Sequence, residues 1–312
     1  MATANRTIME KADMEVSDLI ADGGYLQEEQ AQSFIVDAIK ESTILKQITV
    51  KPMKSHTALI DKVGLNGRVL RPGTSGHAVP VGDRAKPVTE QETLSTHLMK
   101  GEIRLNDEVL EDNIENGTFK TTVMDMMAEQ VAYDMDELCV NGDTGSADTF
   151  LAQLNGMIKL ASSHLVNASD VPIHKGLLKL ALKAMPSQYN RYRADQVFWT
   201  SENAEVDYRD YLADRATVLG DRFLENDAPT KYAGRSLIPV PSFPNNIGTG
   251  THCTSILLTH PKNAVWGIWR KVKVETDRDI QTGEWIMVVT VRAGFQYVEE
   301  DAIVQVHNVK VA

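Results

Sequence analysis

The chain has 312 residues and a mass of 34.5 kDa, enough for about two domains with a buried core, which excludes a peptide-sized or disulfide-stapled scaffold. Hydrophobic residues make up 42% and charged residues 24%, near the averages of globular proteins, so wholesale disorder and a coiled coil are excluded. The 43 acidic against 32 basic residues give a formal net charge of -11, which argues against a dedicated DNA-binding protein, because a phosphate backbone attracts lysine and arginine.

The N-terminal region divides into an arm and a helix. Residues 1–21 lack a sustained apolar period, as is typical of an arm, whereas residues 27–42 place apolar side chains at helical spacing. The Gly-Gly-Tyr-Leu string at 23–26 separates the two and favours a turn. We therefore expect an amphipathic helix from Gln27 to Ser42, preceded by an arm that changes direction.

Residues 51–101 are punctuated by glycine and proline between short alternating segments such as Thr57–Val63. This pattern predicts a long two-stranded β-hairpin with an irregular tip. Such a hairpin has too few apolar residues to be stable alone, so we expect it to lie on a neighbouring subunit. Four of its cations are either solvated or paired with acidic residues of that subunit, and these four are Arg68, Arg71, Arg84 and Lys86.

Two helices are predicted after the hairpin. Asn106 or Asp107 can cap a short helix that ends near Ile114. The longer helix spans Phe119–Val140, where apolar residues recur at three- and four-residue steps, and Asn141-Gly142 ends it. It would be roughly 33 Å long, and we expect its methionines to lie in the core.

The remainder of the chain alternates strands and helices and then closes with β-structure. An α/β subdomain is predicted from the helices at 176–185 and 205–212 and the buried strands at 197–200 and 255–259. Segments 271–276 and 285–292 predict a β-hairpin, and 302–306 a last strand.

No convincing catalytic site is visible in the sequence. Asp143-Thr144-Gly145-Ser146 matches the loop of aspartic proteases, but it follows a helix stop and has no second copy, so we interpret it as a surface loop. The eight histidines show no zinc-hydrolase spacing, and nucleophile-elbow and nucleotide-phosphate motifs are lacking. We expect no enzymatic activity, no cofactor and no metal.

No segment approaches the ~18 apolar residues of a membrane span, and residues 1–16 carry acidic side chains where a signal peptide would be apolar. Cys139 and Cys253 fit no metal-ligand spacing, so we expect two reduced, buried thiols in a cytosolic setting. Neither export nor membrane insertion is expected.

The order of these elements resembles the major capsid proteins of tailed bacteriophages, which have the Hong Kong 97 fold. The likeness covers nearly the whole chain, and an ordered set of strings carries it rather than any one motif. The strings are Gly24-Tyr25-Leu26 ahead of Glu29-Gln30-Ala31 and Phe34-Ile35, then Leu154-Asn155-Gly156-Met157, and last Val289-Thr290-Val291-Arg292 ahead of Gly294-Phe295.

The resemblance implies an α+β, Hong Kong 97-like capsid fold with an N-arm, an extended β-hairpin loop, a peripheral domain with a long spine helix, and an axial α/β domain. The implied parts are an N-terminal arm (1–50), an extended loop (51–103), a peripheral domain with the spine helix (104–170), an axial domain (171–269), a peripheral β-hairpin (270–300) and a C-terminal strand returning to the axial domain (301–312).

The function implied by the resemblance is that of a major capsid protein in the virion, assembled in the cytoplasm of a bacterial host. Its copies would form pentamers and hexamers of an icosahedral head around double-stranded DNA, together with a portal protein and decoration proteins. Some relatives begin with a long scaffolding segment that is cleaved off. Here the arm starts almost at Met1, so a separate scaffolding protein, or none, is implied.

Two properties of the shell follow as expectations. A lining that faces dense DNA should be neutral or acidic, and the arm residues Glu10, Asp13, Glu15 and Asp18 can contribute to it. Some relatives also join a loop lysine to an asparagine of a neighbour. Lys54, Lys62 and Lys86 are available here, although no feature marks any of them as activated.

Two alternatives remain open at this point. An encapsulin-type compartment would share the fold and enclose protein cargo, so the contents of the particle distinguish it from a phage head. A soluble α/β hydrolase would need a nucleophile with a base, and the sequence supplies neither.

Overall fold

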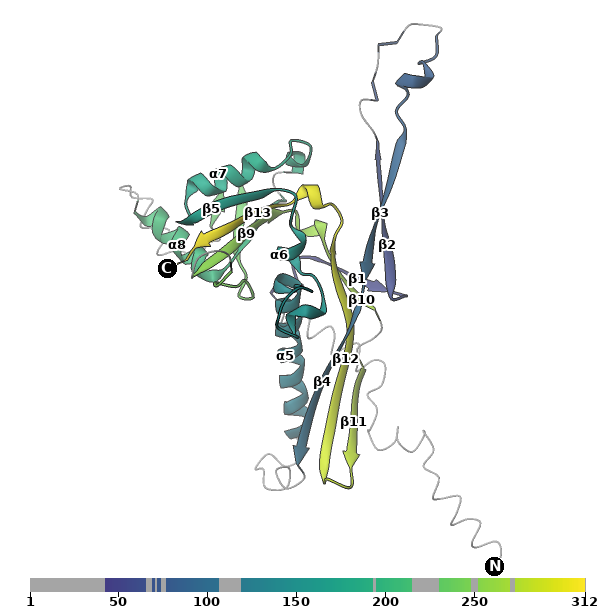
Figure 1. Cartoon of the computed structure of the whole chain (residues 1–312), viewed down its shortest axis with the longest axis vertical. Coiled ribbons are helices and arrows are strands. Elements are labelled where there is room, and N and C mark those ends of the chain that lie inside the picture. The colour runs from purple at the N-terminus through teal and green to yellow at the C-terminus, as the bar shows by residue number, and fades with distance from the viewer. Residues whose placement is uncertain are drawn as a thin grey trace, which may run out of the picture.

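The computed structural model describes residues 43–65, 69–70, 72–73, 77–106, 119–192, 195–214, 230–247, 252–269 and 273–311. The helices expected at 27–42 and before residue 114 lie outside these ranges. Figure 1 shows an elongated part that carries the longest helix and the long strands, a lobe beside it, and a narrow hairpin that projects beyond both. Among the described residues, no helix is long and apolar enough to cross a bilayer.

The elongated part is built on a five-stranded sheet. Its central strand is β12 (Glu284–Tyr297), which pairs on one side with β4 (His97–Asn106). On its other side β12 pairs with β11 (Lys273–Asp279) and β10 (Ala264–Trp269), and β10 in turn pairs in parallel with β1 (Thr49–Met53). Side chains of β12 alternate between buried and half-buried from Met287 to Ala293, because successive residues of a strand point to opposite faces.

Helix α5 (Phe119–Asn141) packs against this sheet, as the apolar spacing predicts. Met127, Met135 and Leu138 are buried in a cluster with Met287 and Val289 of β12. The expectation that the methionines of this helix lie in the core is therefore confirmed for Met127 and Met135 and wrong for Met126, which is 63% exposed because it lies on the solvent side of the helix. The same cluster extends to side chains of the second sheet, which joins the two parts of the molecule through one continuous core.

The end of α5 is fixed by two glycines. The N–H of Gly156 donates to the carbonyl of Gly142 over 2.8 Å, which ties the Leu-Asn-Gly-Met string to the helix stop. A Cβ added to Gly142 would lie 2.5 Å from the Leu154 carbonyl oxygen, and one added to Gly156 would lie 2.7 Å from the Gly142 nitrogen. Only glycine permits this approach of two backbones. The chain then forms α6 (Met157–Leu160).

The lobe contains a six-stranded sheet in the order β5-β13-β9-β6-β8-β7. Helices α7 (Lys175–Ala184) and α8 (Glu202–Ala213) contribute Leu177, Leu178 and Tyr208 to its core. Its strands are β5 (Leu165–Pro172), β6 (Val197–Thr200), β7 (Lys231–Tyr232), β8 (Arg235–Pro239), β9 (Cys253–Thr259) and β13 (Val304–Lys310).

The remaining strands, β2 (Thr57–Leu65) and β3 (Pro87–Ser95), pair only with each other. The expected two-stranded hairpin is therefore present, and its paired part ends at Ser95, because the chain continues past Thr96 into β4, which pairs with β12 instead. Sheet membership also differs from expectation at two segments: β10 pairs within the five-stranded sheet, and β5 within the six-stranded one.

Candidate intersubunit surface at the hairpin

The β2–β3 hairpin is exposed along most of its length. The two strands pair in register from Thr57 opposite Ser95 to Leu65 opposite Pro87. Large apolar side chains of this region nevertheless face solvent, and they are Leu59, Val63, Val69, Leu70, Val79, Val81 and Val88. Leu70 is 91% exposed and Val63 is 75% exposed, so much apolar surface here is not covered by the described part of the chain.

Only the root of the hairpin is packed on the body. Leu94 is fully buried with Met53 and Val265, and Ala58 and Ile60 pack beside them. From the Ile60–Glu92 pair toward the tip of the hairpin, no described side chain is buried. A two-stranded hairpin without a packed face is at best marginally stable in water, so this segment depends on a surface that the single chain does not supply.

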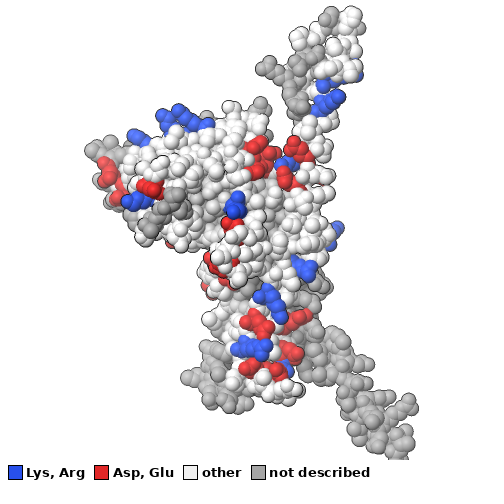
Figure 2. Space-filling view, in the orientation of Figure 1, with Lys and Arg blue, Asp and Glu red and all other residues white. Residues whose placement is uncertain are grey.

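The four cations predicted to contact another subunit are only partly described. Arg68 and Arg71 lie outside the described residues. Arg84 and Lys86 lie at the distal end of the hairpin and are exposed, and the Arg84 Nε donates to the Val79 carbonyl over 3.0 Å. No carboxylate of the described residues forms an ion pair with either, and Figure 2 shows basic side chains near this tip.

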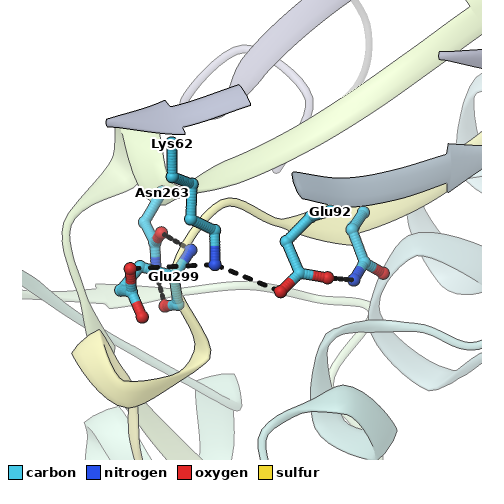
Figure 3. Close-up of polar contacts among 5 residues, drawn as sticks. Lys62, Glu92, Asn263 and Glu299 are labelled. Atoms are coloured by element: carbon cyan, nitrogen blue, oxygen red, sulfur yellow. Dashed lines mark hydrogen bonds and ion pairs between the residues drawn. The ribbon is translucent and has the colours of Figure 1, made fainter. Parts of the chain in front are cut away.

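At the root, Lys62 reaches two carboxylates. Its Nζ lies 3.1 Å from Glu92 Oε1 on the opposite strand and 3.7 Å from Glu299 Oε2, as Figure 3 shows. The Gln296 side chain of β12 adds a longer contact, from Nε2 to Glu92 Oε2 at 3.4 Å. The Lys62 side chain is only 13% exposed, and the hairpin is thereby tied to the segment that follows β12.

Glu299 belongs to the connection between the two sheets, and Asn263 fastens it to a second connection. Asn263 ends the 3-10 helix η4 (Pro261–Asn263) between β9 and β10, whereas Glu299 lies between β12 and β13. The Asn263 Nδ2 donates to the Glu299 carbonyl, and the Glu299 N–H donates to Asn263 Oδ1, each over 2.8 Å. The hairpin, the five-stranded sheet and the six-stranded sheet thus meet at one polar junction, formed by Lys62, Glu92, Asn263 and Glu299.

A glycine lets the hairpin cross the central strand. A Cβ added to Gly294 would lie 1.9 Å from the Ser95 carbonyl oxygen, which no real Cβ tolerates. The next residue, Thr96, is fully buried, and its N–H and Oγ1 both donate to the His56 carbonyl, over 3.1 and 3.0 Å. The direction of the hairpin is therefore set by backbone contact with β12 as well as by the ion pairs.

The start of the described chain has its own anchor on α5. Asp136 is 2% exposed, and its Oδ2 accepts the backbone N–H of Thr43 at 2.6 Å and that of Ile44 at 3.4 Å. Trp199 of β6 donates its indole N–H to Gln47 Oε1 over 2.7 Å. The segment around Thr43 to Gln47 is thus held by α5 and by the six-stranded sheet.

Sequence reasoning missed the junction. Lys62 was named only as a lysine available for cross-linking, and Glu92, Asn263 and Glu299 were not named at all. No local pattern marks them, because they come from three segments that are far apart in the sequence. Of the three lysines considered, Lys54 and Lys86 are exposed, whereas the ion pairs withdraw Lys62 from the surface.

The protease-like string forms a surface turn. Asp143 Oδ1 accepts the N–H of Gly145 at 2.8 Å, and Lys159 Nζ lies 3.0 Å from Oδ2. The Gly145 hydrogen bond, followed by that of Lys159, lowers the pKa of Asp143, so this carboxyl is ionised and suited to an ion pair rather than to a shared proton. In the described part of the chain, no group of three His, Cys, Asp or Glu side chains could hold a metal ion.

Both cysteines are buried, as expected. Burial, and to a smaller extent the charge of Asp136, raises the pKa of Cys139 well above its ordinary value, which is the behaviour of a structural thiol.

Comparison with known proteins finds capsid proteins and an encapsulin that are similar to this chain. The model of the phage capsid family matches residues 23–307. A protein of Bacillus subtilis (strain 168), described as the prophage capsid protein YqbE, is 35% identical over 98% of this chain and 99% of its own length. Among solved structures, a chain of the satellite phage P4 procapsid superposes with a TM-score of 0.65 at 12% identity, covering 90% of this chain and 91% of that one. The holo-SrpI encapsulin of Synechococcus elongatus PCC 7942 superposes with a TM-score of 0.57 at 11% identity, covering 86% and 88%.

Proposed function

The chain belongs to the phage capsid family, and we infer that it is a major capsid protein whose copies assemble into the head shell of a phage. The family is one of structural proteins, not of enzymes. The single observation that carries assembly is the projecting hairpin, whose exposed apolar side chains have no partner among the residues that the structure describes. Such a segment gains burial only from another copy.

We propose the Hong Kong 97 division for the two packed parts. The five-stranded sheet with α5 as the spine helix corresponds to the peripheral domain, and the six-stranded sheet with α7 and α8 to the axial domain. The β2–β3 hairpin corresponds to the extended loop, and residues 1–50 to the arm. Pentamers and hexamers of such subunits would close an icosahedral shell, with a portal protein and separate scaffolding or decoration proteins as further partners.

The tip of the hairpin supplies the polar part of the contact. Arg84 and Lys86 have no acidic partner in the described chain, and Arg68 and Arg71 add two further positive charges nearby in the sequence. We place these four cations against carboxylates of a neighbouring copy. Charge complementarity would set which surfaces meet, while the apolar hairpin residues supply the buried area.

Assembly then completes the fold of each subunit. Beyond Lys62 no described contact supports the hairpin, so its ordering is coupled to its burial on a neighbour. Each subunit would support the hairpin of one neighbour, and its own hairpin would lie on another. The resulting shared interfaces would resist the pressure of packed DNA.

The proposed content of the shell is double-stranded DNA. The net charge of -11 supports this, because an acidic lining releases the genome rather than binding it tightly. A shell around protein cargo is the second candidate, since the holo-SrpI encapsulin shares the fold. The 35% identity to a prophage capsid protein over the whole chain favours the first.

Electron microscopy of the purified chain tests the proposal. Negative staining over a concentration series should show closed shells, and particles isolated from the phage-producing host should contain nuclease-protected DNA. A chain that stays monomeric at every concentration contradicts self-assembly, and particles filled with an enzyme contradict the phage head.

A further inference from the structure

Helix α7 presents a row of lysines to solvent. Lys175, Lys179 and Lys183 stand at four-residue spacing and are all exposed, whereas Leu177 and Leu178 face the core. Figure 2 shows basic side chains along the edge of the lobe over this helix. No carboxylate of the described residues lies within ion-pair distance of any of the three. We call these three residues the lysine row.

Helix α5 carries an acidic row at the same spacing. Asp125, Glu129 and Glu137 are exposed, and the exposed Tyr133 occupies the third of the four positions in the row, between Glu129 and Glu137. From residue 123 to the end of α5 the sequence contains no lysine or arginine. Within the described chain no cation pairs with these three carboxylates.

The two rows share a four-residue register and have similar apolar neighbours. Four residues of α-helix rise about 6 Å, so Lys175 and Lys179 are as far apart as Asp125 and Glu129, whereas Glu137 lies two such steps, about 12 Å, beyond Glu129. Leu180 beside the lysine row is 50% exposed, and Met126 beside the acidic row is 63% exposed. Each row thus combines one sign of charge with an unpartnered apolar side chain, a pair of surfaces that would bury each other well.

The two rows cannot meet within one chain. Helix α7 lies on the six-stranded lobe, and α5 runs along the five-stranded sheet, well apart from it in Figure 1. We propose that the lysine row of α7 docks on the acidic row of α5 of a neighbouring copy in the shell. This inference rests on the proposed shell function and adds a specific contact to it.

The contact is heterologous, because two different surfaces meet. A heterologous contact repeated around an axis closes into a ring, which suits capsomers. Rows at four-residue spacing are inclined by about 26° to their helix axes, so two such rows laid along each other cross at about 50°. Exposed ion pairs contribute little individually, so the contact would orient neighbours that the hairpins hold together.

Zero-length cross-linking of assembled shells tests the contact. Shells are formed from equal amounts of unlabelled and nitrogen-15 subunits, treated with a carbodiimide and analysed by mass spectrometry. We expect mixed-label peptides that join Lys175, Lys179 or Lys183 to Asp125, Glu129 or Glu137. Lysine-row cross-links that lead only to other carboxylates, such as those of the arm or of the hairpin root, would overturn the proposal.

Exchanging the charges of one lysine and one carboxylate gives an independent test of the contact between the two rows. Lys179→Glu and Glu129→Lys should each raise the subunit concentration needed for assembly by about tenfold or more, because like charges then face each other. The double variant should return to the wild-type concentration, and Lys231→Glu, at an exposed lysine of β7 on the same lobe, should change it little. A double variant that assembles no better than the single ones contradicts the pairing. If the wild-type chain forms no shells, the proposed function itself fails, which is a separate result.

Discussion

Asn263 and Glu299 hold each other by two reciprocal hydrogen bonds, from amide to carbonyl and from backbone N–H to amide oxygen, each of 2.8 Å. The pair joins the two strand connections that run between the sheets, and Lys62 links the hairpin to the same place. The relative orientation of three parts of the subunit therefore depends on a few polar atoms.

Replacing Asn263 by alanine should destabilise the subunit by about 1–3 kcal/mol, because the Glu299 N–H and carbonyl both lose their partner in a half-buried position. Urea unfolding of the isolated subunit measures this. Asn246→Ala is the matched control, since that asparagine is exposed and should change stability by less than about 0.5 kcal/mol. Equal effects of the two substitutions would contradict the role of the junction.

Gly294→Ala should cost about 1–3 kcal/mol or more, because the added methyl group would overlap the Ser95 carbonyl and displace the hairpin from β12. The same change at Gly64 meets nothing within 4 Å. Thermal unfolding of both variants gives the comparison. An unchanged melting temperature for Gly294→Ala would show that the hairpin root does not cross β12 as described.

Two adjacent methionines test the buried side of α5. Met127 is 5% exposed and Met126 is 63% exposed. Met127→Ala should destabilise by about 2–5 kcal/mol through loss of buried contacts and the cavity it leaves, whereas Met126→Ala should stay within about 0.5 kcal/mol. Denaturant unfolding distinguishes them, and a reversed order would mean that the helix is rotated about its axis. Val131, on the predicted apolar face, proves to be half-buried and is a weaker probe.

Deleting residues 64–82 should leave a folded subunit that forms no shells, because the lost segment contributes no buried side chain to its own chain among its described residues. Circular dichroism reports the fold, and electron microscopy reports assembly. Shells of normal size from this deletion would exclude the hairpin from the contacts that hold the particle together.

Isolated subunits should bind duplex DNA no more tightly than micromolar at physiological salt, since a net charge of -11 opposes association with phosphates. A gel-shift titration at two salt concentrations measures this. In a second part of the experiment, four acidic residues of the N-terminal arm are replaced by Gln or Asn, namely Glu10, Asp13, Glu15 and Asp18. These replacements should strengthen DNA binding. Nanomolar, salt-sensitive binding by the wild-type chain would instead indicate a nucleoprotein role.

The elements that the sequence predicts well are those with a strong local period. Helix α5 matches its prediction to one residue, β6 matches it fully, and β11 and β12 form the expected hairpin. Their signals are contained in windows of four to twenty residues, where apolar spacing reports directly which side is buried.

What the sequence does not predict is pairing between distant segments. The exposed sequence of β4 carries no sign that it lies along β12, and β1 pairs with β10 across most of the chain. The polar junction is missed for the same reason, because its four residues come together only after both sheets have formed. The sequence predicts the hairpin itself but not the ion pairs that Lys62 forms with Glu92 and Glu299 of the same chain.

The position of β13 has a consequence for the timing of biosynthesis. This strand lies between β5 and β9, and both of its neighbours are translated before it. Until residues 304–310 have left the ribosome, the six-stranded sheet lacks the strand that joins its edge strand β5 to β9, and β5 has no strand partner in the described chain. A nascent chain therefore lacks a finished lobe and part of the core on which α7 is seated. In the proposed shell, this order would keep incomplete polypeptides from presenting the α7 surface to a neighbour.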